Sequence, residues 1–141
     1  MNLEPFNILQ IVFVVQASFG ALLLANKNQY RGLVALLISI ALLMIFNLLE
    51  ELGITRQYIL ITPIFSLSNG PLFYLFVRQL VYNNKPLNSR DWLHLLPALL
   101  FLPFTQWTQT VLFLGTVSQI IYAVFSFSLL IHYHKGCLEL R

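Results

Sequence analysis

Charged residues are scarce in this chain, and their scarcity excludes most soluble folds. Of its 141 residues, eight are Lys or Arg and five are Asp or Glu, so 9% are charged while 58% are hydrophobic. A soluble protein of this size needs more polar residues to cover its surface. Because a lipid bilayer accepts an apolar surface, the composition predicts a membrane protein.

Patterns for metal binding and catalysis are also missing. The single cysteine, Cys137, excludes a disulfide within the chain. His132 and His134 project from nearly opposite sides of a helix, so they do not chelate a metal as an i, i+4 pair does. The sequence has neither a phosphate-binding glycine loop nor a serine nucleophile elbow. We therefore expect no metal, no cofactor and no enzymatic activity.

The sequence does contain five apolar stretches separated by short polar loops. They cover residues 6–24, 32–49, 58–77, 92–107 and 111–133. A helix needs roughly 20 apolar residues to cross about 30 Å of hydrocarbon, and the fourth stretch is the shortest. None alternates in polarity as a strand of a membrane barrel would. The sequence therefore predicts an all-α integral membrane helical bundle, residues 1–141 forming one domain of about five transmembrane helices.

The basic residues predict how this bundle is oriented. Loops that keep Lys and Arg stay on the cytoplasmic side of the membrane. With five spans, Arg56 falls on one side and all the other basic residues fall on the opposite side: Lys27, Arg31, Arg78, Lys85, Arg90, Lys135 and Arg141. This predicts an outside amino terminus and a cytoplasmic carboxyl terminus. Cations spread over loops at one face suit lipid headgroups, so we expect no direct nucleic-acid binding by this chain.

The third stretch has the most unusual local chemistry. Ser66, Asn69, Gly70 and Pro71 lie together near its middle. Pro71 cannot donate its amide and its ring clashes with the preceding turn, so a kink or a break is expected. Two interpretations remain open: a packing kink whose polar groups bond neighbouring helices, or a ligand pocket or moving hinge.

Polar and small residues on other stretches allow similar alternatives. Gln119 and Tyr122, followed by Ser126, recur at helical spacing, and they either line a cavity or form hydrogen bonds between helices. Alanines recur at every fourth position of the first stretch, at Ala17, Ala21 and Ala25. This stripe permits close helix packing, either within the chain or in a homo-oligomer.

The end of the second stretch has a helix-stop pattern. Glu50 and Glu51 lie about 100° apart around a helix, so they do not converge as a catalytic pair. We expect them at a solvated interfacial end. Gly53, just beyond them, is expected to cap the helix.

Three ordered motifs indicate a family. NQYRGL at residues 28–33, GPLFYLFVRQL at 70–80 and DWLHLLPALL at 91–100 occur in that order. Together they resemble the multi-span amino-terminal membrane region of bacterial AraC-type transcriptional regulators, which is similar to a region on some sensor histidine kinases. The resemblance covers roughly residues 20–135. Besides Gly70 and Pro71, the matching motif positions are Tyr74, Arg78, Trp92, His94 and Pro97.

The resemblance implies a function in signalling. It suggests a non-enzymatic sensor or anchor module of the bacterial inner membrane, which passes a change of state to a linked cytoplasmic output domain. Such regions resemble seven-span bundles, whereas this sequence predicts about five spans. We therefore expect a truncation before a cytoplasmic output domain. A small oligomeric transporter protomer or an accessory membrane subunit is the alternative.

Overall fold

The computed structural model describes residues 5–56, 60–82 and 88–139, and these residues contain helices and no strand. The all-α prediction is confirmed. The elements, in chain order, are α1 (Pro5–Leu24), η1 (Asn28–Tyr30), α2 (Arg31–Glu51), α3 (Thr62–Val81), η2 (Ser89–Leu95), α4 (Leu96–Leu100), η3 (Leu102–Phe104) and α5 (Thr108–Glu139), where η denotes a 3₁₀ helix.

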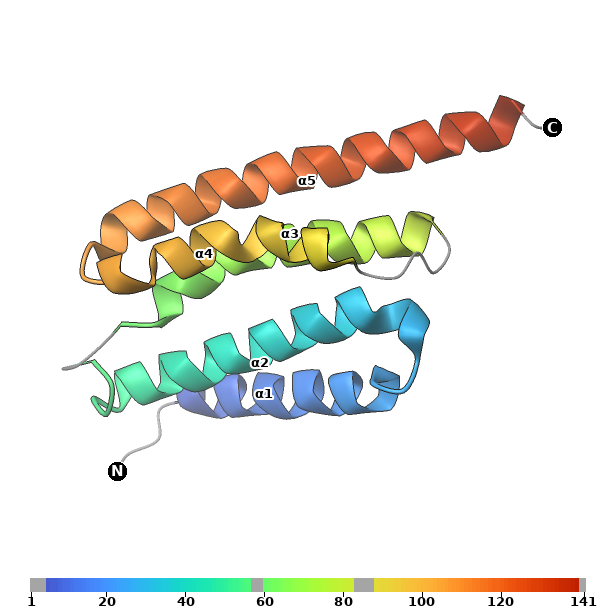
Figure 1. Ribbon diagram of the computed structural model, residues 1–141. Coiled ribbons are helices and arrows are strands. Elements are labelled where there is room, and N and C mark those ends of the chain that lie inside the picture. Colours follow the sequence, from blue (N-terminus) through green and yellow to red (C-terminus); the bar gives the residue numbers. More distant parts are fainter. Residues whose placement is uncertain (1–4, 57–59, 83–87, 140–141) are drawn as a thin grey trace.

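Successive segments of the chain run in opposite directions (Figure 1). Helices α1 and α2 form a hairpin, α3 lies between α2 and α5, and the η2–α4–η3 segment runs back beside α3. One end of the bundle holds the α1–α2 connection, the end of α3, the start of η2 and the carboxyl end of α5. The other end holds the start of α1, the end of α2, the start of α3 and the η3–α5 connection.

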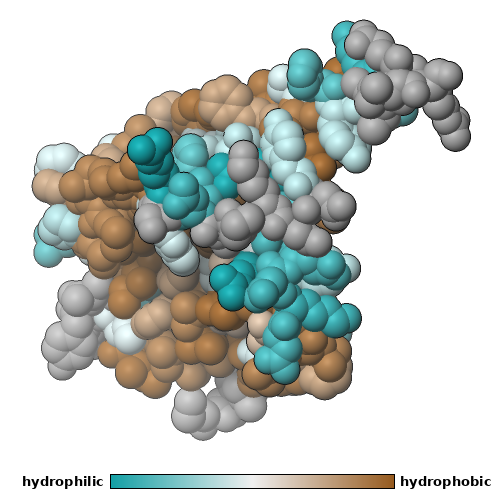
Figure 2. Space-filling model, turned by 45° about the vertical axis from the view of Figure 1, so that its right-hand side comes forward, coloured by the Kyte–Doolittle hydropathy of each residue, from teal (hydrophilic) through white to brown (hydrophobic). Residues whose placement is uncertain are grey.

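Three helical stretches among the described residues are long and apolar enough to cross a membrane. They are Pro5–Leu24, Asn28–Glu51 and Thr108–Lys135. Many large apolar side chains on them face outward, for example Phe19, Leu22 and Phe127, which are 61%, 75% and 69% exposed. Figure 2 shows the same broad apolar surface, with hydrophilic residues gathered toward the connections at one end. These features indicate a membrane protein.

Helix α3 is the most buried long helix although its sequence is less apolar. Its 20 residues include Ser66, Asn69 and Gln79, yet half of them are buried. Only four residues each are buried in α1 and α2. Because α3 lies between α2 and α5, neighbouring helices cover much of its surface, including the buried Gln79.

The fourth predicted span is not one continuous helix, contrary to expectation. Residues 92–104 are divided among the short helices η2, α4 and η3, and residues 105–107 form a turn before α5. Pro97 and Pro103 occupy the first turns of α4 and η3, because a proline ring fits the first turn of a helix but disrupts its interior. A 3₁₀ helix rises about 2.0 Å per residue, so η2, α4 and η3 placed end to end extend at most about 28 Å, slightly less than the hydrocarbon thickness of about 30 Å.

Helix α3 also begins later than expected. The predicted third span started at residue 58; residues 58 and 59 lie outside the described part, and α3 begins at Thr62. The carboxylate of Glu50 fixes this start, because its Oε1 accepts hydrogen bonds from the amides of Ile61 and Thr62 at 2.8 and 3.0 Å. The expected solvated position is therefore wrong for Glu50, which is 9% exposed. Glu51 is exposed and accepts a hydrogen bond from Gln10 at 3.1 Å.

The predicted glycine cap of α2 is confirmed. Gly53 adopts φ 76°, in the left-handed region that glycine tolerates best. Its amide donates to the Glu50 carbonyl, and the Ile54 amide donates to the Leu49 carbonyl, at 3.1 and 3.0 Å. These two bonds form a Schellman motif, which ends α2 and turns the chain toward α3.

We expect Glu50→Ala to lower the free energy of unfolding by about 1–2 kcal/mol, because two α3 amides lose their acceptor. Glu50→Gln is the matched control, since it keeps an oxygen at the same position and should lose less than half as much. Thermal unfolding in detergent, followed by circular dichroism, measures both. Equal losses in the two variants would contradict the capping role.

Candidate functional site

Gln79 joins α3 to the start of α2. Its side chain is 2% exposed. Its Oε1 accepts from the amide of Gly32 at 2.6 Å, and its Nε2 donates to the carbonyl of Asn28 at 2.9 Å. A Cβ at Gly32 would lie 2.9 Å from the Cα of Phe76, so the two backbones touch here. The sequence interpretation missed this role; the only signal was a glutamine in an apolar stretch.

Asn69 joins α3 to the middle of α2. The hydroxyl of Ser39 donates to Oδ1 of Asn69 at 2.9 Å. Ser39 is buried and Asn69 is half-buried. Between the same two helices, the rings of Phe46 and Phe65 stack with their centroids 6.0 Å apart. The α2–α3 contact thus combines one polar pair with aromatic packing.

A close contact between α3 and α5 brings four residues together, and we call it the α3–α5 seam: Ser66, Gly70, Gly115 and Gln119. A Cβ at Gly115 would overlap the Ser66 side chain, and one at Gly70 would lie 3.0 Å from the Cα of Gln119. Nε2 of Gln119 donates to the carbonyl of Ser66 at 3.0 Å. Helix α3 presents two small residues four apart, Ser66 and Gly70, and α5 presents Gly115 opposite Ser66; small residues of this kind let membrane helices approach closely.

Pro71 lies inside α3, and the helix continues through it. The sequence predicted a kink or a break at Pro71, and the continuous helix excludes the break. Pro71 is among the largest fully buried side chains. Pro71 removes the amide that would bond the Leu67 carbonyl four residues earlier, and the adjacent Ser66 carbonyl accepts a hydrogen bond from the Gln119 side chain of α5. Hydrogen bonding between helices is thus the observed use of Gln119.

An aromatic cluster continues the α3–α5 contact toward the other end of the bundle. Nδ1 of His94 lies 3.0 Å from the hydroxyl of Tyr122. The Tyr74 ring lies 5.8 Å from both rings, measured between centroids, and 6.5 Å from Phe125. The motif positions Tyr74 and His94 therefore contact Tyr122, which the sequence suggested as a ligand-binding residue. Within the described ranges, no three His, Cys, Asp or Glu side chains are grouped as metal ligands would be.

Arg78 and Asp91 form an ion pair between α3 and η2. The amide of Asn88 also donates to Oδ2 of Asp91 at 2.8 Å. The hydrogen bond from Arg78 lowers the pKa of the Asp91 carboxyl, and the same bond raises the pKa of Arg78. The motif position Arg78 thus has a structural partner that the sequence interpretation did not identify.

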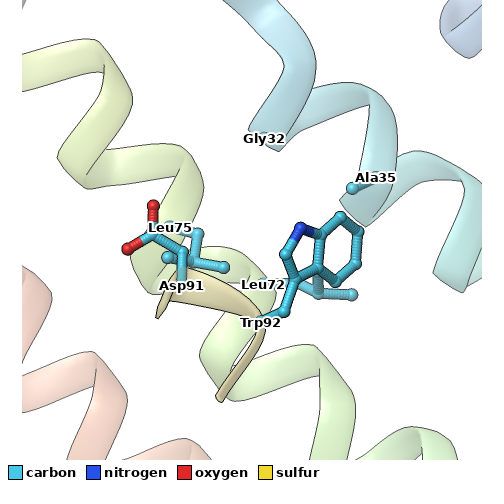
Figure 3. A pocket seen from close by; sticks show the side chains of 6 residues that line it. All are labelled: Gly32, Ala35, Leu72, Leu75, Asp91 and Trp92. Atoms are coloured by element: carbon cyan, nitrogen blue, oxygen red, sulfur yellow. The ribbon is translucent and has the colours of Figure 1, made fainter. Parts of the chain in front are cut away.

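Trp92 packs η2 toward α2. It lines a pocket of about 10 Å³ with Gly32, Ala35, Leu72, Leu75 and Asp91 (Figure 3). A space of this size holds no more than about one water, so it is a packing contact and not a ligand site. Pro97, the remaining motif position, is exposed in the first turn of α4.

A larger groove lies between α2, α3 and α5, and we call it the α2–α5 groove. Its volume is about 340 Å³, and its lining residues are Leu36, Ile40, Asn69, Gly70, Phe73 and Gln119. Three of the predicted ligand or hinge residues therefore share one groove. Tyr122 does not line it, because it pairs with His94.

Comparison with known proteins found no matching family model, curated protein or solved structure. The resemblance to AraC-type regulators therefore remains a prediction from the sequence motifs.

We expect Gly115→Ala to destabilise the protein by about 1–3 kcal/mol, because the added methyl overpacks against Ser66. Gly20→Ala is the matched control, since its Cβ would lie 3.4 Å from Leu37, an ordinary contact distance. Thermal unfolding in detergent compares the two. Adding Ser66→Gly should restore part of the stability lost in Gly115→Ala; an equal loss with and without it would contradict the seam.

The Arg78–Asp91 pair predicts a stability change at acid pH. Since the folded-state pKa of Asp91 is lowered, the pair stabilises fully above about pH 4, the ordinary pKa of Asp, and this contribution disappears as pH falls through the lowered value. Asp91→Asn should cost about 1–3 kcal/mol at neutral pH. Unfolding measured from pH 7 to pH 2 should show a smaller acid-induced loss in Asp91→Asn than in the wild type. If the wild type and Asp91→Asn lose the same stability between pH 7 and pH 2, the Arg78–Asp91 pair does not cause the acid-induced loss.

Proposed function

We propose that this chain is a non-enzymatic sensor or anchor module of a bacterial signalling or transcription-regulatory protein. In this proposal it crosses the inner membrane five times, with its amino terminus outside. Helix α5 enters the cytoplasm and passes a change in the bundle to a linked output domain. The family resemblance suggests a DNA-binding or kinase output.

The length and packing of α5 carry this proposal. Its 32 residues extend about 48 Å, whereas the hydrocarbon is about 30 Å thick. The first half packs against α3 at the α3–α5 seam, and the carboxyl end projects past the other helices (Figure 1). A continuous helix of this kind connects the core of the bundle with a region beyond it.

The distribution of cations supports the proposed orientation. Lys27 and Arg31 lie at the α1–α2 connection, and Arg78 and Lys135 lie in the carboxyl-terminal parts of α3 and α5. These parts share one end of the bundle (Figure 1). Arg56, in the α2–α3 connection, belongs to the other end. Lys85 and Arg141 lie outside the described residues. Basic residues at one end favour a cytoplasmic location for that end.

The α3–α5 seam offers a way to transmit a change. The Ser66–Gly115 and Gly70–Gln119 contacts leave no space between the helices, so any displacement of α3 must also displace α5. A stimulus acts through such a contact only if it binds two helix arrangements unequally. In this proposal, the hinge at Gly70 and Pro71 is this close contact, through which α3 and α5 move together, and not a break within α3.

A transporter protomer has less support. A pathway for it would need the polar residues Asn69, Gln119 and Tyr122 to line one space, but Tyr122 is paired with His94 and does not line the α2–α5 groove. The accessory-subunit alternative predicts that α5 anchors without transmitting, and the following experiment separates it from the sensor.

Alanine insertions test whether α5 transmits or only anchors. The chain is joined after Arg141 to a cytoplasmic reporter domain whose transcriptional output depends on dimer geometry. One to seven alanines are inserted after Tyr133, where each rotates the reporter by about 100° around α5. We expect reporter output to vary with a period of about 3.6 residues, with membrane abundance measured as the control. Output that is independent of insertion length would leave only the anchor role.

A further inference from the structure

The α2–α5 groove contains two amide side chains that each use only half of their hydrogen-bonding capacity. Oδ1 of Asn69 accepts from Ser39 at 2.9 Å, and Nε2 of Gln119 donates to the Ser66 carbonyl at 3.0 Å. The Ser66 carbonyl can only accept, so it fixes the orientation of the Gln119 amide, and Asn69 turns its Oδ1 toward the Ser39 hydroxyl. Within the described residues, Nδ2 of Asn69 and Oε1 of Gln119 make no hydrogen bond. The groove therefore presents one donor and one acceptor.

In the proposed topology, these two groups lie at the depth of the hydrocarbon. Gln119 follows the start of α5 by eleven residues, or about 16 Å, which is close to half of the 30 Å thickness. Gln119 is exposed and Asn69 is half-buried, so both are accessible from the groove. At this depth, acyl chains offer neither donor nor acceptor, and a polar group without a partner is unfavourable. An occupant that satisfies both groups needs an acceptor and a donor of its own.

The shape of the groove suits a small molecule. Its volume of about 340 Å³ lies within the usual range of small-molecule sites, which are mostly apolar with a few polar groups. Leu36, Ile40 and Phe73 supply the apolar wall. A helix of a second copy is about 10 Å wide, so only one or two of its side chains would enter a space of this size.

We propose that the α2–α5 groove binds an uncharged amphiphile from the bilayer, with a medium-length apolar chain and an amide or protonated carboxyl headgroup. The carbonyl of this headgroup accepts from Nδ2 of Asn69, and its N–H or O–H donates to Oε1 of Gln119. The chain lies against Leu36, Ile40 and Phe73. A charged carboxylate is excluded, because it lacks a proton for Gln119 and no cationic side chain lines the groove.

This inference rests on the proposed function for its biological meaning, since the amphiphile would be the stimulus. Asn69 belongs to α3 and Gln119 to α5, so one headgroup bonds both sides of the α3–α5 seam. Occupancy would favour the helix arrangement in which the free donor and the free acceptor are both satisfied.

Photolabelling of the full chain in proteoliposomes tests the site without any signalling readout. The probe is decanamide carrying a diazirine and a terminal alkyne, with labelled peptides identified by mass spectrometry. We expect saturable labelling on α2, α3 and α5 at the groove, competed by unlabelled decanamide and not by decane. Decanoic acid should compete better at pH 5 than at pH 8, because only the protonated carboxyl can donate to Gln119. This pH dependence distinguishes binding of the acid from binding of the amide.

Substitutions assign this labelling to the groove. Gln119→Leu and Asn69→Leu should each weaken probe binding about five- to tenfold, the factor of one neutral hydrogen bond. Thr116→Val is the matched control: Thr116 is exposed one turn earlier on α5, bonds only the Leu112 carbonyl of its own helix, and lies outside the groove. Leu36→Trp should abolish labelling by filling the groove while leaving both amides in place. Circular dichroism and gel filtration establish that each variant is folded.

Other outcomes would overturn the proposal. Labelling that decanamide does not compete, that decane competes equally, or that folded Gln119→Leu and Leu36→Trp leave unchanged would exclude the site. If Gln119→Leu converts a dimer to a monomer while wild-type labelling is not competed, the groove instead docks a second copy. If reporter output is periodic but the groove is not labelled, the amphiphile proposal fails and the sensor proposal stands. If labelling is competed but reporter output does not depend on insertion length, the binding site stands and the sensor proposal fails.

Discussion

The need to satisfy polar groups in a medium without water organises this protein. Helix α3 carries polar side chains that lipid cannot solvate, and it is the helix that neighbours surround most completely. Gln79 bonds the start of α2, and Asn69 bonds its middle. The outer helices α1, α2 and α5 carry the apolar surface that faces outward. The bundle is thus arranged around its least apolar long helix.

Hydrogen bonds and small residues together determine how the helices approach. In lipid, apolar side chains gain little by leaving the hydrocarbon, so contact depends on close packing and on polar pairs. The α3–α5 seam has both, because Gly70 and Gly115 remove side-chain bulk and Gln119 bonds the Ser66 carbonyl. This seam links the core to the longest helix, and the proposed sensor function depends on that connection. The proposed ligand lies at the same seam, because it would bond Nδ2 of Asn69 and Oε1 of Gln119.

Local signals in the sequence predicted some features well and others poorly. Gly53 was correctly identified as a cap, because a positive φ is a property of one residue and its immediate neighbours. Glu50 was misplaced, because its partners Ile61 and Thr62 belong to the next helix and no helical periodicity links them. The fourth span was predicted from its hydropathy, which does not show that Pro97 and Pro103 divide it into short helices.

The sequence by itself determined the class of this protein: scarce charge and long apolar runs leave helices in a membrane as the stable solution, since helices satisfy their backbone within one segment. It also indicated which polar residues were unusual. Only the tertiary structure decided their partners. It joined Gln119 to Ser66 and Asn69 to Ser39, and it turned Tyr122 to His94 and away from the groove. Partners across helices depend on the rotation and crossing of whole helices, which spacing along the chain does not encode.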